Sequence, residues 1–126
     1  MSPQSHRRPK RGISASDARD LLLRLEGVSP GRSYGFPSFL LDGKFFARFR
    51  DDDTVLVLRL GTIEDRDVLM QLDAKAFFFT DHYRDYPSVL IRLAEVPPGL
   101  LADVMAAAWR SAQRAQRTRA KRRPRK

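Results

Sequence analysis

The chain has 126 residues, of which 42% are hydrophobic and 10% aromatic, and it contains no cysteine. This length allows one domain with a hydrophobic core, and the lack of cysteine excludes disulfides, thiolate metal sites and a thiol nucleophile. No apolar run reaches the roughly 18 residues that a membrane span needs, and no apolar segment follows the basic N-terminus as it would in a secretory signal. We therefore expect a cytoplasmic protein that does not enter the membrane.

The formal net charge of +9 is concentrated at the two ends of the chain. Residues 1–12 carry four basic residues and residues 110–126 carry nine, and neither segment contains an acidic residue. The other 11 basic residues lie with all 15 acidic residues in 13–109, so that part has a net charge of −4. Terminal basic blocks are typical of solvated tails and of proteins that bind nucleic acid.

The N-terminal segment, residues 1–14, is expected to be a flexible basic arm. A helix is predicted to begin near Ser16, which can cap it, and to end at about Gly27. Its apolar stripe would consist of Ala18, Leu21, Leu22 and Leu25, which fall at helical spacing. Residues 28–37 contain two prolines and two glycines and are predicted to form a loop, which Tyr34, Phe36 and Phe39 should anchor to the core.

Three consecutive strands are predicted between residues 34 and 60. Asp42-Gly43 is a strong hairpin signal, because both residues tolerate the positive φ of a tight turn. The next turn is Asp51 to Asp53, and the strand after it is apolar at nearly every position, which predicts a central strand.

The strand arginines are predicted not to form one patch. Arg48 and Arg50 share a face of their strand, but a three-residue loop at Asp51–Asp53 would put Arg59 on the opposite face. The favoured interpretation is that Arg48, Arg50, Arg59 and Arg92 are solvent-facing residues with apolar stems over the sheet. Base recognition by a β-ribbon is the alternative.

A second helix is predicted from about Ile63 to Leu72, with Thr62 as its cap and Val68 and Leu69 facing inward together with Leu72. Two further strands are expected, at residues 76–80 and 88–96, and the second would turn Val89, Ile91 and Leu93 to one face. The last helix should start near Pro97-Pro98. Its apolar stripe would be Leu101, Val104, Met105, Ala108 and Ala112, bordered by Trp109, and it should fray past about Arg114.

The loop His82-Tyr83-Arg84-Asp85-Tyr86 gathers aromatic and polar groups between strands, where functional residues often lie. It could stack a nucleotide or bind a small acid through Arg84. The alternative is a structural loop pinned by Tyr83 and Tyr86, with Arg84 paired to an acid.

Catalysis and metal binding have little support in the sequence. No catalytic or phosphate-cradling glycine motif is present, and one of the two histidines, His6, lies in the N-terminal arm. Asp51–Asp53 is more simply a turn than a metal site. We therefore expect no enzyme activity, no cofactor and no metal.

Several short motifs, in this order, resemble the MmcQ/YjbR family over roughly residues 15–112. They are Tyr34-Gly35-Phe36-Pro37-Ser38-Phe39, Gly43-Lys44-Phe45-Phe46-Ala47-Arg48, Leu56-Val57-Leu58-Arg59, Ala76-Phe77-Phe78-Phe79, His82-Tyr83-Arg84 and Val89-Leu90-Ile91-Arg92-Leu93. The resemblance implies a CyaY-like (frataxin-like) α+β fold and DNA binding. Many relatives have a His-Trp pair after the histidine loop, where this chain has Tyr86-Pro87-Ser88, so no role of that pair is carried over.

The resulting prediction is a single α+β domain over residues 15–113, an antiparallel sheet packed against helices, with basic tails at 1–14 and 114–126. It would bind nucleic acid, in the first place DNA, as a monomer, through phosphate contacts of weak sequence specificity. The predicted contact residues are Arg48, Arg50, Arg59, Arg84, Arg114, Arg117, Arg119, Lys121, Arg122 and Arg123. The alternative is a small-ligand or enzyme-like domain with a pocket formed by Tyr34, Phe36, His82, Tyr83 and Tyr86.

Overall fold

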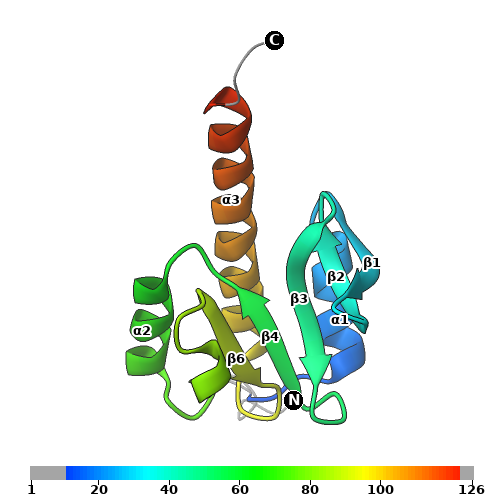
Figure 1. Cartoon of the computed structure of the whole chain (residues 1–126). Coiled ribbons are helices and arrows are strands. Elements are labelled where there is room, and N and C mark those ends of the chain that lie inside the picture. Colours follow the sequence, from blue (N-terminus) through cyan, green and yellow to red (C-terminus); the bar gives the residue numbers. More distant parts are fainter. Residues whose placement is uncertain (1–10, 123–126) are drawn as a thin grey trace, which may run out of the picture.

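Six antiparallel strands form one sheet, in the order β1-β2-β3-β4-β6-β5, within the part of the chain that the computed structural model describes, residues 11–122. Three helices, α1, α2 and α3, accompany the sheet (Figure 1). The predicted fold class, a single α+β domain, is confirmed. The four strands β1 to β4 follow each other as a meander, and α2 leads the chain to the far edge.

Helix α1 spans Ala15–Arg24 and is capped by Ser14, whose Oγ accepts a hydrogen bond of 3.0 Å from the backbone N–H of Asp17. The expected cap at Ser16 is therefore wrong by two residues. Ser14 has the extended backbone that a cap requires, whereas Ser16 already lies in the helix. The predicted apolar stripe is correct, since Ala18 and Leu22 are fully buried.

Residues 11–14, which the sequence assigns to the flexible arm, are bonded to the domain. The N–H groups of Gly12 and Ile13 donate to the carbonyls of Val96 and Leu93. Arg11 forms an ion pair of 3.0 Å with Asp73 and also donates to the carbonyl of Glu95. The first ten residues of the predicted arm lie outside the described residues.

The segment predicted as a loop contains an edge strand, β1 (Val28–Ser33), paired with β2 (Phe36–Leu41). An edge strand tolerates Pro30, because proline has no N–H to donate to a second neighbour. Tyr34 and Gly35 form the turn with positive φ values of 52° and 83°. Of the three expected anchors only Phe39 is buried, whereas Tyr34 is 96% exposed and Phe36 is 51% exposed.

Strands β3 (Lys44–Arg50) and β4 (Val55–Arg59) are joined by a turn of four residues, Asp51–Thr54. Arg50 therefore lies opposite Val55, and Arg48 lies opposite Val57. The strand register predicted from a three-residue loop is therefore wrong by one position. Since side chains alternate along a strand, Arg59 falls on the same face as Arg48 and not on the opposite one.

A β-bulge at Phe46 interrupts the alternation of side chains along β3. Phe39 pairs with Ala47 but Leu40 pairs with Phe45, so Phe46 is an extra residue in its strand. Phe46 is 1% exposed and packs in the main core, whereas Phe45 packs on the opposite face with Val57 and Leu90. Alternation along the strand already turns Phe45 and Phe46 to opposite faces. The bulge has a different effect, since it allows the consecutive residues Phe46 and Ala47 both to pack in the main core.

Helix α2 spans Ile63–Leu72, as predicted, and Thr62 accepts a capping hydrogen bond from the N–H of Asp65. Its predicted inward face is only partly correct. Leu69 packs on the core, but Val68 and Leu72 are 62% and 63% exposed. The buried residue of α2 is Arg66, because its guanidinium bonds to the loop that follows β5.

After α2 come β5 (Phe77–Phe78), the short 3-10 helix η2 (Asp81–Tyr83) and β6 (Ser88–Arg92). β5 is shorter than the predicted strand at residues 76–80. β6 ends at Arg92, four residues before the end of the predicted strand at 88–96. The predicted face is confirmed, since Val89, Ile91 and Leu93 all pack in the main core.

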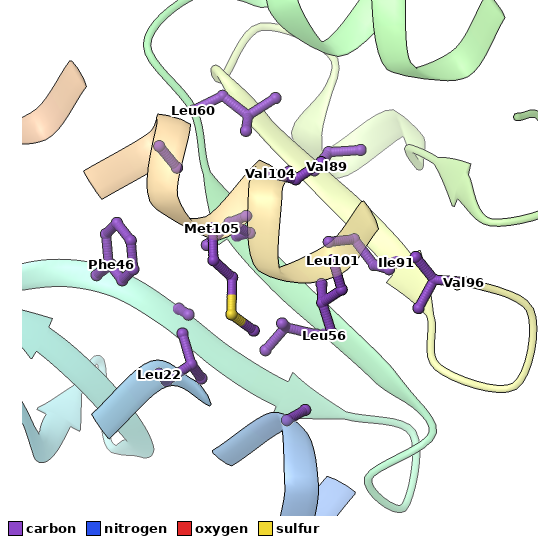
Figure 2. Close-up of a cluster of buried hydrophobic side chains, with 14 of the residues drawn as sticks. Leu22, Phe46, Leu56, Leu60, Val89, Ile91, Val96, Leu101, Val104 and Met105 are labelled. Atoms are coloured by element: carbon purple, nitrogen blue, oxygen red, sulfur yellow. The ribbon is translucent and has the colours of Figure 1, made fainter. Parts of the chain in front are cut away.

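Helix α3 spans Pro98–Arg122 and covers one face of the sheet with its first half. Figure 2 shows Leu101 and Met105 of α3 among Leu22 of α1, Leu56 of β4 and Ile91 of β6. The indole Nε1–H of Trp109 donates to the carbonyl of Glu26, over 2.7 Å, which ties α3 to the end of α1.

The second half of α3 extends beyond the end of β4 (Figure 1). Residues 114–122, predicted as part of a flexible tail, are helical, because alanine and arginine both favour helix. The amide of Gln116 also approaches the carbonyl of Leu41 at 3.4 Å. Residues 123–126 lie outside the described residues.

Candidate functional site: two basic grooves

The sheet face away from the main core carries a groove of about 590 Å³. Its base includes Phe45 of β3 and Tyr83 of η2, which pack on the buried residues Val55, Val57 and Leu90. The β1–β2 turn and the loop between η2 and β6 also contribute to its lining. We call this space the aromatic groove.

The structure brings all five residues of the predicted pocket into the aromatic groove: Tyr34, Phe36, His82, Tyr83 and Tyr86. The rings of His82 and Tyr83 meet edge to face with centroids 4.9 Å apart, and the Tyr83 and Tyr86 centroids are 6.4 Å apart. Such edge-to-face pairs stabilise each other and hold the rings in defined orientations. Tyr86 nevertheless remains 56% exposed.

Two arginines line the same groove. The guanidinium of Arg48 lies over the ring of Phe36, 4.4 Å from its centroid, and Arg59 stands exposed at the end of β4. None of the described residues that line the aromatic groove is acidic. This local excess of positive charge stands out because residues 13–109 together carry a net charge of −4.

Arg66 holds the loop that supplies His82, Tyr83 and Tyr86. It is 3% exposed, and its guanidinium donates to the carbonyls of Tyr83, Arg84 and Tyr86 over distances of 2.9–3.1 Å. The same guanidinium lies over the ring of Phe79, 4.0 Å from its centroid. The sequence analysis missed this residue, although Arg66 falls at helical spacing between Ile63 and Leu69.

Of the four predicted contact residues that precede α3, two lie outside the aromatic groove. Arg50 shares the face of Arg48 and is paired with Asp51 at 3.3 Å. Arg84 is exposed and paired with Asp81 at 2.7 Å, which matches the structural alternative for this loop. Arg92, on the same sheet face, stacks on Phe78 at 3.9 Å and donates to the carbonyl of Lys75.

A second groove, of about 490 Å³, lies between α3 and the segment before α2. Arg114 and Arg119 line it together with Gly61 and Thr62, and we call it the helix groove. Asp65 also lines it. The two grooves adjoin the same chain segment, since Arg59 lines the aromatic groove and Gly61 lines the helix groove.

The remaining predicted contact residues belong to the end of the chain. Arg117 is exposed on α3 but does not line the helix groove. The backbone of Lys121 and Arg122 continues the helix, and Arg123 lies outside the described residues.

Over the described residues, no cluster of three or more histidine, aspartate or glutamate side chains is arranged to hold a metal ion. In the same part of the chain, no helix has the length and apolar character to cross a membrane. Comparison with family models, curated proteins and solved structures finds no match to this chain.

Proposed function

We propose that this protein binds nucleic acid, in the first place DNA, mainly through phosphate contacts of weak sequence specificity, as its resemblance to the MmcQ/YjbR family implies. The observation that carries the proposal is the aromatic groove. It presents Arg48 and Arg59 without an acidic residue in its described lining, on a domain that is otherwise negatively charged. Positive clefts of this kind attract polyanions and increase their rate of association.

The helix groove supports the same proposal. Arg114 and Arg119 stand on the part of α3 beside Gly61 and Thr62, next to the strand end that carries Arg59. A nucleic acid that follows the surface around residues 59–62 would meet both sets of arginines. Bound phosphates would release counterions, so affinity should fall steeply with salt.

The test is the salt dependence of duplex DNA binding, measured by fluorescence anisotropy between about 50 and 200 mM salt. With about five phosphates neutralised, log K should fall against log salt with a slope of about −4.5. Arg48→Gln with Arg59→Gln should reduce the size of that slope by about 1.8, since each lost contact removes about 0.9. Arg114→Gln with Arg119→Gln should do the same.

The matched control is Arg24→Gln, which removes an exposed arginine at the end of α1, outside both grooves. It should leave the slope within about 0.9 of the parent. A flat salt response of the full chain would overturn the proposal, and so would a loss of slope in Arg24→Gln equal to that in the groove variants.

A second candidate is the binding of a small ligand in the aromatic groove. Its volume of about 590 Å³ lies in the range of small-molecule sites, and its aromatic lining with a few polar groups is typical of them. NMR titration with mononucleotides would test it. Chemical-shift changes confined to His82, Tyr83 and Tyr86 that persist at high salt would favour this candidate over phosphate-driven binding.

A further inference from the structure

We infer that the aromatic groove takes unpaired bases of a single-stranded nucleic acid, which stack on Tyr34 and Tyr86 while Arg48 and Arg59 contact the adjoining phosphates. The inference rests on the proposed function and specifies its ligand. It predicts a preference for strands with unpaired bases. Phosphate contacts alone do not give this preference, because single and double strands both carry phosphates.

The first observation is where the exposed rings lie. Over the described residues, six large hydrophobic or aromatic side chains are exposed, and three of these are aromatic. All three, Tyr34, Phe36 and Tyr86, line the aromatic groove, whereas the three aliphatic ones do not. Exposed rings gathered at one place offer flat apolar surface to a flat apolar ligand, and every nucleobase has such a face.

The second observation is that both stacking residues are held by the backbone around them. Tyr34 lies in the tight turn between β1 and β2, where the guanidinium of Arg32 donates to the carbonyl of Gly35 over 2.7 Å. Tyr86 lies in the loop that Arg66 fixes through three carbonyls. A backbone that is already fixed loses little conformational entropy when a ligand binds. The ring of Tyr86 is also held by its contacts with Tyr83 and His82, whereas the ring of Tyr34 is 96% exposed and is fixed only at its backbone.

The third observation is the charge beside these rings. Arg48 is stacked on Phe36, so its guanidinium is held in the groove, and Arg59 stands exposed in the same lining. A backbone phosphate lies next to every base of a strand, so a site with both rings and arginines fits a base with its phosphates. In a duplex the base faces are covered by their neighbours, and the exposed rings would remain without partners.

The experiment compares four probes of equal length on the full chain at one salt concentration. They are a thymidine oligonucleotide, a uridine oligonucleotide, an abasic phosphodiester strand and a DNA duplex, each about a dozen nucleotides long. We expect a base-containing single strand to bind more tightly than the abasic strand, by about 5- to 150-fold for each base that stacks. The thymidine and uridine arms distinguish DNA from RNA, and the inference is supported where either of them binds more tightly than the abasic strand.

Tyr34→Ala and Tyr86→Ala should each weaken binding of the base-containing strand by about 5-fold or more and leave the abasic strand unchanged. Tyr34→Phe keeps the ring and should bind like the parent. The matched control is Leu72→Ala, which removes an exposed apolar side chain on α2, away from both grooves. Thermal unfolding of each variant confirms that it is folded.

Equal affinity for the abasic and base-containing strands would overturn this inference while leaving the proposed phosphate binding intact. So would Tyr34→Ala and Tyr86→Ala variants that bind as tightly as Leu72→Ala. Absence of binding to all four probes would overturn the proposed function itself, and the inference with it.

Discussion

The guanidinium carbon of Arg48 lies 4.4 Å from the centroid of the Phe36 ring, across two neighbouring strands of the sheet. This contact has two consequences. It holds a positive charge in the aromatic groove, and it keeps the half-exposed Phe36 ring in place above the sheet.

A double-mutant cycle should detect this contact directly. Phe36→Leu and Arg48→Met remove the ring and the charge separately while keeping apolar bulk. Their effects on the free energy of unfolding should be coupled by about 0.5–1 kcal/mol, the size of a partly exposed cation–π interaction. Urea denaturation of the parent, the two single variants and the double variant measures the coupling, and additive effects would show that the contact contributes nothing to stability.

Arg66 should be the most sensitive polar position of the domain among the described residues. Arg66→Met fills the same space but leaves the carbonyls of Tyr83, Arg84 and Tyr86 without their donor, so we expect the free energy of unfolding to fall by about 3 kcal/mol. Arg66→Lys keeps the charge but loses the planar fork, and should be destabilised as well. Urea denaturation measures both, and an unchanged midpoint for Arg66→Met would contradict the structural role given to this residue.

The turn after β3 should be stabilised by glycine. Asp51, Asp52 and Asp53 all have positive φ, between 54° and 62°, which costs energy for any residue with a Cβ atom. Asp52→Gly should therefore raise the free energy of unfolding by about 0.5 kcal/mol. Asp52→Ala removes the same charge but keeps a Cβ, and should be less stable than Asp52→Gly. Equal midpoints for the two variants in thermal unfolding would argue against backbone strain at this turn.

The ion pair between Arg11 and Asp73 predicts a pH dependence of stability. Burial acts to raise the pKa of Asp73, but hydrogen bonds and charge from Arg11, together with the N–H groups of Ala76 and Lys75, outweigh it and lower the pKa below its ordinary value. A carboxylate with a lowered folded-state pKa stabilises the fold above its unfolded pKa of about 4, and this contribution disappears as pH falls through the folded pKa.

Arg11→Ala should raise the pKa of Asp73 and so move the loss of this stabilisation to a higher pH. NMR titration of the Asp73 carboxyl carbon measures the shift, and unfolding at neutral and at acid pH measures its effect. Arg24→Ala, which removes a distant exposed arginine, is the control. A pKa for Asp73 that is the same in Arg11→Ala and in the parent would contradict the assignment.

The features that the sequence alone determined are those with a local cause. The bounds of α2, the Asp42-Gly43 turn, the face that Val89 and Ile91 share on β6 and the apolar stripe of α3 depend on caps, turn residues and periodicity, and all were predicted correctly. The charge separation between the ends and the middle of the chain is likewise a property of the sequence. The residues of the predicted pocket were found because their aromatic and polar types stand out in two short segments.

Only the tertiary structure decided how these parts combine. One extra residue in the turn at Asp51–Thr54 brings Arg59 to the face of Arg48, because side chains alternate along a strand and a shift of one position exchanges the faces. The hydrogen bonds of Arg66 to a loop distant in sequence decide which side of α2 faces the domain. Val68 and Leu72, which were predicted to face inward, are therefore turned to solvent. β1 forms because the neighbouring strand β2 supplies hydrogen bonds that outweigh the loop-forming tendency of Pro30 and Gly31, and residues 28–33 carry no periodic apolar pattern that would predict a strand.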